Sequence, residues 1–197
     1  MLKNKIIKLL VGTNNKGKLR EIKDLLPKNL EIYSPKDFKM KSPPENGKTF
    51  EENSLIKAKF FSKKSKMTCL SDDSGLEIDA LNNEPGVFSA RYAGPKCLAE
   101  DNINKVLSKL KVCSNRKAKF RTVIALIVDG EENLFSGECH GEIIRAQIGD
   151  DGFGYDPIFL PQDSELTFAQ MDKFEKGLIS HRGISVRKLI EFLSLKK

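Results

Sequence analysis

The chain has 197 residues and a formal net charge of +7, with 39% hydrophobic and 31% charged residues. This balance excludes a disordered polyelectrolyte, and the length suffices to bury a core, so we expect a single domain over residues 1–197. The longest uncharged apolar run, Val123–Val128, is far shorter than the roughly 20 residues of a membrane-spanning helix. No cleavage pattern follows the apolar run Ile6–Val11 near the N-terminus. We therefore expect a cytoplasmic protein without a membrane partner.

Positive charge is concentrated near the N-terminus. Residues 1–68 contain 17 lysines and arginines against 7 acids, whereas residues 69–197 contain 17 against 20. Basic segments suit phosphates, on either a nucleotide or a nucleic acid backbone. Lysine-rich solvated helix faces give the same count, so charge alone leaves both interpretations open.

The cysteines do not form a recognisable metal or disulfide pattern. No C-x-x-C pair occurs among Cys69, Cys97, Cys113 and Cys139. We therefore expect neither a structural zinc site nor a disulfide framework. Cys69 lies in an apolar strand pattern, which favours a buried small hydrophobic residue over a nucleophile.

The first third of the chain predicts a βαβ opening. A strand over residues 6–12 precedes the polar turn Thr13–Lys18, and apolar residues at helical spacing follow from Leu19 until Pro27. A second strand is expected over residues 30–34, followed by a loop over residues 35–48 that contains three prolines. Thr49 and Glu52 fit a capping box at the start of a helix that continues to about Lys66.

The rest of the chain predicts a mixed sheet with further helices. Strand-like runs at residues 68–71 and 76–80 flank the acidic segment Asp72-Asp73-Ser74-Gly75, which places these acids at a strand end. The turn signal Asp129-Gly130 predicts a hairpin. Further elements expected from periodicity are a helix over 99–110, strands over 118–128, 134–144 and 157–160, and a helix over 184–195.

The segment Thr13–Lys18 is a candidate anion site. The N–H groups at the start of a helix favour a negative ligand, and Lys16 and Lys18 add positive charge. The segment is not a Walker loop. An asparagine-capped helix start with solvated lysines is the alternative.

The acidic segment is a candidate Mg²⁺ site, together with Glu45 in the long loop and Glu51 or Glu52 on the following helix. Mg²⁺ takes a few carboxylates and completes its shell with water and substrate phosphate. Adjacent side chains on a strand point to opposite faces, so we expect one aspartate to be the ligand, and we choose Asp73 as the nearer to the strand end. The alternative is an Asx turn.

Two segments near the C-terminus complete the set of candidates. The glycines in the segment 152–157 allow close approach of backbone to a ligand, and an aromatic side chain beside them can stack on a planar base. A turn before a strand is the alternative. His181 and Arg182, beside Lys176 and a helix start that Ser180 can cap, can donate to a carbonyl or phosphate, and a surface cap is the alternative. Together the four segments indicate a nucleoside triphosphate site without a Walker loop.

Five motifs resemble the inosine triphosphate pyrophosphatase family in order and spacing, from about Lys8 to Leu189. They are Thr13-Asn14-Asn15-Lys16, Ser71-Asp72-Asp73-Ser74-Gly75-Leu76, Pro85-Gly86-Val87-Phe88-Ser89-Ala90-Arg91-Tyr92, Gly152-Phe153-Gly154-Tyr155-Asp156-Pro157-Ile158-Phe159 and Ser180-His181-Arg182-Gly183. The resemblance implies an elongated α/β fold, with a long twisted mixed β-sheet flanked by helices and an active-site cleft between two lobes. It also implies a homodimer that hydrolyses XTP, ITP and dITP to the monophosphate and pyrophosphate with Mg²⁺ as cofactor.

The resemblance also assigns roles to individual residues. Asp73 and Glu45 match the metal ligands, and Asp73 also matches the proton acceptor for the attacking water. Some relatives carry two adjacent acids before the helix start, whereas Pro44 precedes Glu45 here. The residues that match substrate contacts are Thr13, Asn14, Asn15, Lys16, Gly17, Lys18, Lys57, Ser74, Phe153, Gly154, Tyr155, Asp156, Lys176, His181 and Arg182.

Two other functions are compatible with parts of the pattern. A basic RNA- or DNA-binding module would explain the positive N-terminal segment, but that segment has few aromatic side chains for stacking on bases. We therefore expect no stable nucleic acid partner. A pyrophosphatase that prefers pyrimidine or ordinary nucleotides is the second alternative.

Overall fold

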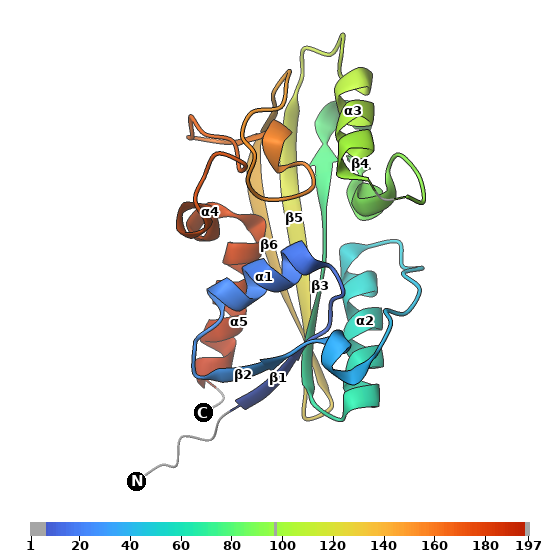
Figure 1. The fold of residues 1–197 in the computed structure, drawn as a ribbon, viewed down its shortest axis with the longest axis vertical. Coiled ribbons are helices and arrows are strands. Elements are labelled where there is room, and N and C mark those ends of the chain that lie inside the picture. Colours follow the sequence, from blue (N-terminus) through green and yellow to red (C-terminus); the bar gives the residue numbers. More distant parts are fainter. Residues whose placement is uncertain (1–6, 97, 196–197) are drawn as a thin grey trace. The chain divides into compact units, whose positions relative to one another are not determined.

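The computed structural model describes residues 7–96 and 98–195. Figure 1 shows the α-helices and strands in chain order. The strands are β1 (Ile7–Val11), β2 (Leu30–Tyr33), β3 (Thr68–Ile78), β4 (Glu84–Pro85), β5 (Lys117–Val128), β6 (Glu131–Ile143) and β7 (Phe159–Pro161). The α-helices are α1 (Lys16–Leu25), α2 (Phe50–Ser65), α3 (Ala99–Lys109), α4 (Lys173–Ile179) and α5 (His181–Leu195).

The strands form one mixed sheet of seven strands. Its order is β2-β1-β3-β5-β6-β7, and β4 pairs with β3 outside this path. β1 runs parallel to both β2 and β3, whereas the β3–β4 and β6–β7 pairs are antiparallel. The predicted α/β class with a mixed sheet is therefore confirmed, as is the central place of β5.

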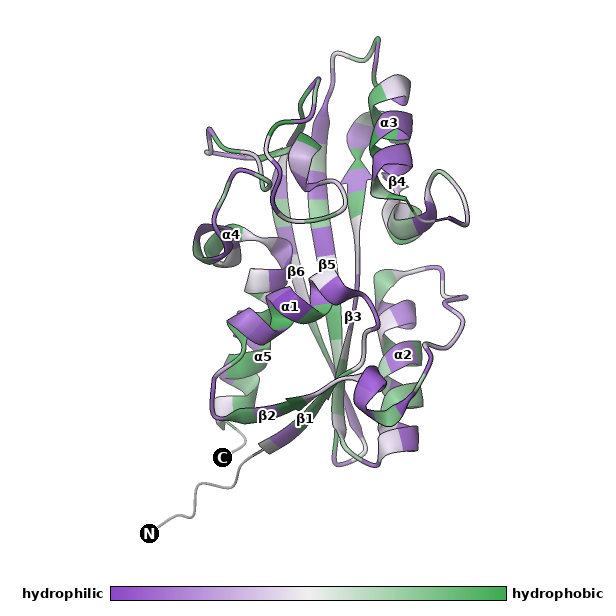
Figure 2. Cartoon of the chain, viewed as in Figure 1, coloured by the Kyte–Doolittle hydropathy of each residue, from purple (hydrophilic) through white to green (hydrophobic). Residues whose placement is uncertain are grey.

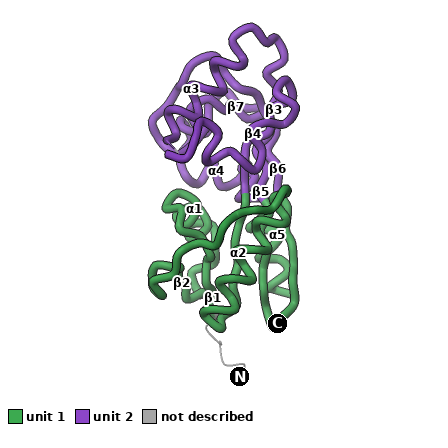
Figure 3. Tube along the Cα trace, turned by 90° about the vertical axis from the view of Figure 1, so that its right-hand side faces the viewer, with its two compact units in different colours: residues 1–73, 123–136, 185–197 green, residues 74–122, 137–184 purple. Residues whose placement is uncertain are grey.

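The chain divides into two compact units (Figure 3). Unit 1 comprises residues 1–73, 123–136 and 185–197, and unit 2 comprises residues 74–122 and 137–184. Strands β3, β5 and β6 each contribute residues to both units. The single domain and the cleft between lobes stay predictions.

The core of unit 1 follows from the two-residue period of its strands. Leu9 and Val11 of β1 pack with Ile22 of α1 and Val186 of α5. Leu10, between them in sequence, packs instead with Phe61 of α2 and Cys69. Because alternate side chains point to opposite faces of a sheet, α1 and α5 contact one face and α2 the other.

The core of unit 2 is richer in aromatic side chains. Ile103 and Val106 of α3 pack in one cluster with Leu76 of β3. Phe120 of β5 contacts the Phe159 ring edge to face, with a centroid distance of 4.7 Å. Apolar and polar residues alternate around α3, as Figure 2 shows, so that the helix buries one side only.

Strand β3 differs from the prediction. The sequence predicted two strand-like runs with the acids at a strand end, but β3 runs without interruption through Asp72 and Asp73. The predicted turn and the Asx alternative are therefore wrong. Gly75 serves a close approach instead, because a Cβ there would lie 2.2 Å from the carbonyl oxygen of Gly86. Pairing within the sheet outweighs the local preference of aspartate, serine and glycine for turns.

Side-chain caps set the helix starts. α1 begins at Lys16 rather than Leu19, because the Asn15 side chain accepts a hydrogen bond from the Lys18 N–H at 3.0 Å. α5 begins at His181 rather than Ile184, and the Ser180 hydroxyl accepts from the Gly183 N–H at 3.1 Å as predicted.

Only one of the two hydrogen bonds of the predicted capping box forms at the start of α2. The Thr49 hydroxyl accepts a hydrogen bond from the Glu52 N–H at 3.1 Å. Glu52 Oε2, however, accepts from the N–H of Lys48 at 2.6 Å, not from that of Thr49. The side chain of Glu52 therefore holds the preceding loop against the helix.

Helix α4 was not predicted. Its N-cap Asp172 accepts hydrogen bonds from the N–H groups of Phe174 and Glu175, and Glu175 accepts from the Asp172 N–H in return. This capping box is readable in the sequence as an aspartate followed three residues later by a glutamate. That pattern was the available signal.

Cys69 lies in the core of unit 1, as predicted, and burial raises the pKa of its thiol to about 12. Cys113 and Cys139 are also free thiols, and Cys97 lies outside the described residues. Within residues 7–96 and 98–195, the structure contains no helix with the length and apolar character needed to cross a membrane.

Truncation of Ile124 should destabilise the protein. This side chain of β5 is fully buried in the cluster that contains Leu9 and Val186. We expect Ile124→Ala to lower the free energy of unfolding by about 2–5 kcal/mol, measured by urea denaturation. Val112→Ala is the control, because Val112 is 93% exposed and its truncation should change stability by less than about 0.5 kcal/mol. Equal losses of stability in Ile124→Ala and Val112→Ala would contradict the burial of Ile124 in this core.

Candidate functional site

The loop after β1 leads directly into α1. A Cβ at Gly12 would lie 2.2 Å from Ser71 Oγ and 2.7 Å from Phe61, so only glycine fits between these neighbours. The buried Thr13 accepts a hydrogen bond from the Asn15 N–H at 3.2 Å through its hydroxyl. Asn14 donates to the Ser42 hydroxyl at 2.9 Å, which ties this loop to the loop after β2.

The predicted anion site lies at the N-terminal turn of α1. Asn14, Asn15 and Lys16 are exposed, whereas Gly17 and Lys18 are half-buried. The hydroxyl of Thr13 and the side chain of Asn15 are engaged in the turn and the cap. The exposed cation of Lys16 and the N–H groups of the first helical turn are therefore the groups best placed for an anion.

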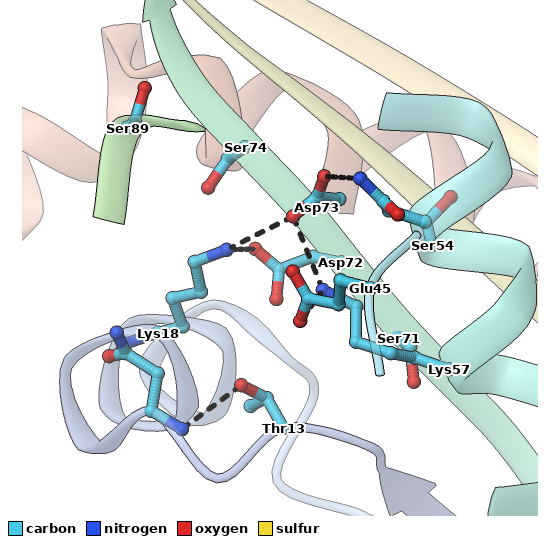
Figure 4. A network of polar contacts seen from close by, with 12 residues as sticks. Thr13, Lys18, Glu45, Ser54, Lys57, Ser71, Asp72, Asp73, Ser74 and Ser89 are labelled. Atoms are coloured by element: carbon cyan, nitrogen blue, oxygen red, sulfur yellow. Dashed lines mark hydrogen bonds and ion pairs between the residues drawn. The ribbon is translucent and has the colours of Figure 1, made fainter. Parts of the chain in front are cut away.

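Carboxylates and lysines from four segments of unit 1 meet at β3. Figure 4 shows Lys18 of α1 reaching toward Asp72 and Asp73, with Glu45 and Lys57 beside Asp73. Lys18 Nζ lies 3.4 Å from Asp72 Oδ2 and 4.0 Å from Asp73 Oδ1. Lys57 Nζ lies 3.2 Å from Asp73 Oδ1 and 3.0 Å from Glu45 Oε1. The structure thus brings together Lys18, Glu45, Lys57 and Asp73, which are far apart in sequence.

Both aspartates belong to this cluster. Lys18 Nζ lies within ion-pair distance of both carboxylates, because a long lysine side chain can reach carboxylates that start on opposite faces of a strand. The expectation that only Asp73 of the two is a metal ligand stays a prediction. Asp72 is 1% exposed and Asp73 is 5% exposed.

Burial and charge act against each other at this cluster. Burial raises the pKa of Asp73, and the attraction of Lys18 and Lys57 only partly opposes it. Burial also disfavours the charged form of Lys57, but Asp73, Glu45 and Asp72 outweigh it and raise the Lys57 pKa. Lys57 therefore carries a proton at neutral pH.

The donor set fits a Mg²⁺ ion that shares its shell with substrate. Within the described part of the chain, no group of three or more histidine, cysteine, aspartate or glutamate side chains is arranged to hold a metal ion. Asp73 and Glu45 nevertheless converge on one point, because both contact Lys57 Nζ. Mg²⁺ is commonly held by one or two carboxylates together with substrate phosphates. Glu52, considered as a further ligand from the sequence, accepts a hydrogen bond from the Lys48 N–H, and its role as a ligand stays a prediction.

A second group of candidate residues lies within unit 2. Arg182 is 1% exposed and donates a hydrogen bond to the Ser74 hydroxyl at 2.9 Å. Lys176 Nζ lies 2.6 Å from Asp156 Oδ2, which also accepts from the Phe153 N–H at 2.7 Å. Lys176 and Arg182 both flank the Phe153 ring, at 5.4 Å and 5.7 Å from its centroid.

The residues of the glycine-rich loop divide into exposed and buried ones. Phe153 and Gly154 are partly exposed, and Gly154 has a φ of +65°, which favours glycine. Tyr155 is buried, and its hydroxyl donates to the Ser89 carbonyl oxygen at 2.8 Å. His181 is also buried, with its ring stacked on Phe120 at 4.7 Å. Within this loop, Phe153 and Gly154 are therefore the more accessible candidates.

Two buried polar residues at these clusters were not singled out from the sequence. Asn53 of α2 donates to Asp73 Oδ2 at 3.2 Å. The Ser89 hydroxyl accepts from the Leu76 N–H and donates to the Gly86 carbonyl oxygen. An asparagine inside a helix is a weak signal, since asparagine favours caps and turns. Ser89 lies in one of the five family motifs, but the resemblance gave it no role.

Comparison with known proteins identifies the family. The Ham1 family pattern matches residues 9–192. The dITP/XTP pyrophosphatase of Christiangramia forsetii is 48% identical over 189 residues, covering 95% of this chain and 100% of that protein. The dITP/XTP pyrophosphatase of Flavobacterium johnsoniae is 44% identical, covering 97% and 100%.

Solved structures agree with this result. The Ham1 protein of Staphylococcus aureus superposes with a TM-score of 0.87 at 40% identity, covering 96% of this chain and 100% of that one. The Mycobacterium abscessus nucleoside-triphosphatase, or dITP/XTP pyrophosphatase, gives a TM-score of 0.74 at 39% identity, covering 95% and 99%. The fold and the relatives define a hydrolase of the nucleoside triphosphate pyrophosphatase class. The chain belongs to the Ham1 family.

The raised pKa of Asp73 predicts a pH-dependent stability. A carboxyl whose pKa is higher in the folded state contributes most below its unfolded value of about 3.9, and the contribution is lost as the pH rises through the folded pKa. In urea denaturation with chelator present, Asp73→Asn should therefore gain stability relative to the unsubstituted protein as the pH rises above about 4. If Asp73→Asn instead lost stability relative to the unsubstituted protein over that pH range, the attraction of the lysines would outweigh burial in setting the Asp73 pKa.

Proposed function

We propose that the protein hydrolyses the non-standard purine nucleotides ITP, XTP and dITP to monophosphate and pyrophosphate, with Mg²⁺ as cofactor. Such an activity would keep these nucleotides out of DNA and RNA. The observation that carries the proposal is the buried Asp73 carboxylate beside Lys18, Lys57 and Glu45. The names of relatives that are 44% and 48% identical support the substrate class.

In this proposal the phosphates bind to unit 1. Lys16 and the first-turn N–H groups of α1 bind phosphate oxygens, because the helix start favours negative charge. Lys18 and Lys57 add positive charge where negative charge develops on the phosphates during the reaction. The loop Thr13–Asn15 positions this helix start through its own hydrogen bonds.

Asp73 and Glu45 would hold the Mg²⁺ ion, which neutralises charge on the phosphate oxygens when bound. Asp73 also accepts the proton of the attacking water, a role that its raised pKa suits. The water oxygen forms a bond to the α-phosphorus while the bond to the bridging oxygen breaks. The pyrophosphate leaves with that oxygen and the bonding electron pair.

The base binds to the second group of residues, within unit 2. The Phe153 ring stacks on the purine, and the guanidinium of Arg182 donates to the 6-oxo oxygen. Further contacts with the base in this proposal are Ser74, Gly154, Lys176 and His181. The buried Tyr155 and Asp156 hold the glycine-rich loop in place. Adenine presents an amino group at the same position, so a donor there is left without an acceptor, and such a mismatch can cost a factor of about 10⁴.

The proposal includes a homodimer, on the family resemblance, and a cytoplasmic location, on the sequence pattern near the N-terminus. The purine nucleotide is the partner that the site chemistry supports. The only observation in favour of a nucleic acid partner is the excess of lysine and arginine over acidic residues in residues 1–68.

Removal of the Asp73 carboxylate should abolish turnover. Asp73→Asn keeps the shape of the side chain but removes the proton acceptor, so we expect kcat for ITP to fall by about 10²–10⁴-fold. The measurement is the rate of pyrophosphate release at saturating Mg²⁺. Glu132→Gln is the control, since Glu132 lies in unit 1 and pairs with Lys59 at the surface. Turnover of Asp73→Asn within threefold of the unsubstituted enzyme would refute the assignment.

Replacement of Arg182 should reduce discrimination against ATP. Arg182→Lys keeps the charge in a buried position but loses the planar fork of donors. We expect the ratio of kcat/KM for ITP to that for ATP to fall by about tenfold. Arg187→Lys on the exposed side of α5 is the matched control. An unchanged ratio in Arg182→Lys would clear this residue of a role in base selection.

A further inference from the structure

Asn53 joins two parts of the cluster in unit 1 through a single amide group. Its side chain is fully buried on α2. Nδ2 donates a hydrogen bond to Asp73 Oδ2 at 3.2 Å, and Oδ1 accepts one from the Gly47 N–H at 2.9 Å. The partners fix the orientation of the amide, because a backbone N–H can only donate and a carboxylate can only accept.

Gly47 belongs to the loop that carries Glu45. A Cβ at Gly47 would lie 2.7 Å from Asn53 Oδ1 and 2.7 Å from Glu52 Cβ, so the loop backbone lies directly against α2. Glu52 holds the next residue, Lys48, by its N–H. Two successive α2 residues therefore anchor the segment that follows Glu45.

Asn53 and Lys57 lie four residues apart on α2, on the same face of the helix. Lys57 Nζ contacts Asp73 Oδ1, and Asn53 Nδ2 contacts Asp73 Oδ2, so each carboxylate oxygen has its own donor from one helix. Lys57 supplies charge to this contact. Asn53 supplies a directional hydrogen bond without charge. Lys57 contacts the Glu45 carboxylate, whereas Asn53 binds the backbone of the same loop at Gly47.

We infer that Asn53 is a positioning residue that sets the spacing between the Asp73 and Glu45 carboxylates and the rotation of the Asp73 carboxylate. The inference rests on the proposed function, in which these two carboxylates hold Mg²⁺. Lysine at position 53 would lack the acceptor, and aspartate would lack the donor, so an amide is the group that satisfies both partners. Because Asn53 is not a substrate contact in the proposed site, its loss should change the Mg²⁺ requirement and kcat rather than the KM for nucleotide.

Two variants test the two ends of the amide. Asn53→Asp keeps an acceptor for the Gly47 N–H but turns a second carboxylate oxygen toward Asp73. Gly47→Ala leaves the amide intact and displaces the loop. The matched control is Asn104→Asp, because the exposed Asn104 of α3 also donates to a carboxylate, that of Glu100, at 3.2 Å.

We expect Asn53→Asp to lower kcat for ITP by about 10–100-fold, the effect seen in other enzymes when a residue that hydrogen-bonds to a metal ligand is replaced. The Mg²⁺ concentration for half-maximal rate should rise at least about fivefold in both variants, on the scale of such outer-shell losses. The KM for ITP at saturating Mg²⁺ should stay within about twofold, because no phosphate contact is removed. Asn104→Asp should match the unsubstituted protein in all three quantities.

Trypsin cleavage after Lys48 supplies a readout that does not depend on turnover. Gly47→Ala should be cleaved faster than the unsubstituted protein, whereas Asn53→Asp should not, because it keeps the acceptor. An unchanged Mg²⁺ requirement in whichever variant folds would overturn the inference, as would a rise in KM equal to the fall in kcat/KM. If the unsubstituted protein fails to hydrolyse ITP, the proposed function fails, but trypsin cleavage of Asn53→Ala, which lacks the acceptor for the Gly47 N–H, still tests whether Asn53 anchors the loop. Faster cleavage of Asn53→Ala supports the anchor, and unchanged cleavage overturns it.

Discussion

The site of this protein depends on the placement of a buried carboxylate, that of Asp73. A charge removed from water is costly unless opposite charge and hydrogen bonds replace the lost hydration. Here the compensation for Asp73 on β3 comes from two helices, because Lys18 lies on α1 and Lys57 and Asn53 lie on α2. Each helix of this group also packs on a face of the sheet through apolar residues of its own. Core packing therefore determines where the charges meet.

The balance of charge at the cluster suits a nucleotide with its cation. Three carboxylates, those of Glu45, Asp72 and Asp73, face two lysines, so the formal charges of these groups sum to −1. A surplus of negative charge favours a divalent cation, and in the proposed function the two lysines add positive charge beside the phosphate oxygens. Attraction alone would not order these groups, since long side chains are flexible. The neutral amide of Asn53 orients the Asp73 carboxylate, because a hydrogen bond is directional and the attraction between charges is not.

Much of the fold was predictable because local and tertiary preferences agree. The helix α3 shows a clean apolar period, and the turn Asp129-Gly130 joins two strands as predicted. Strand β3 was missed because the preference of Asp72-Asp73-Ser74-Gly75 for turns conflicts with burial in the sheet, and burial wins. The short α4 has too few turns for a periodic signal.

The chemistry of the candidate site was more predictable than its connections. The family resemblance placed Glu45, Lys57 and Asp73 among the functional residues, and the structure brings these three side chains together. It did not indicate Asn53, because an amide has no charge or reactivity that a motif would reveal. That contact depends on the close approach of the Gly47 backbone, which only the folded chain shows.

The central claim is that this site releases pyrophosphate selectively from non-standard purine nucleotides. The most direct test incubates the protein and Mg²⁺ with ITP, XTP, dITP, ATP and GTP separately, and identifies both products by chromatography. The account predicts monophosphate and pyrophosphate from ITP, XTP and dITP, with little turnover of ATP and GTP. Diphosphate with single phosphate, or equal turnover of all five nucleotides, would contradict it.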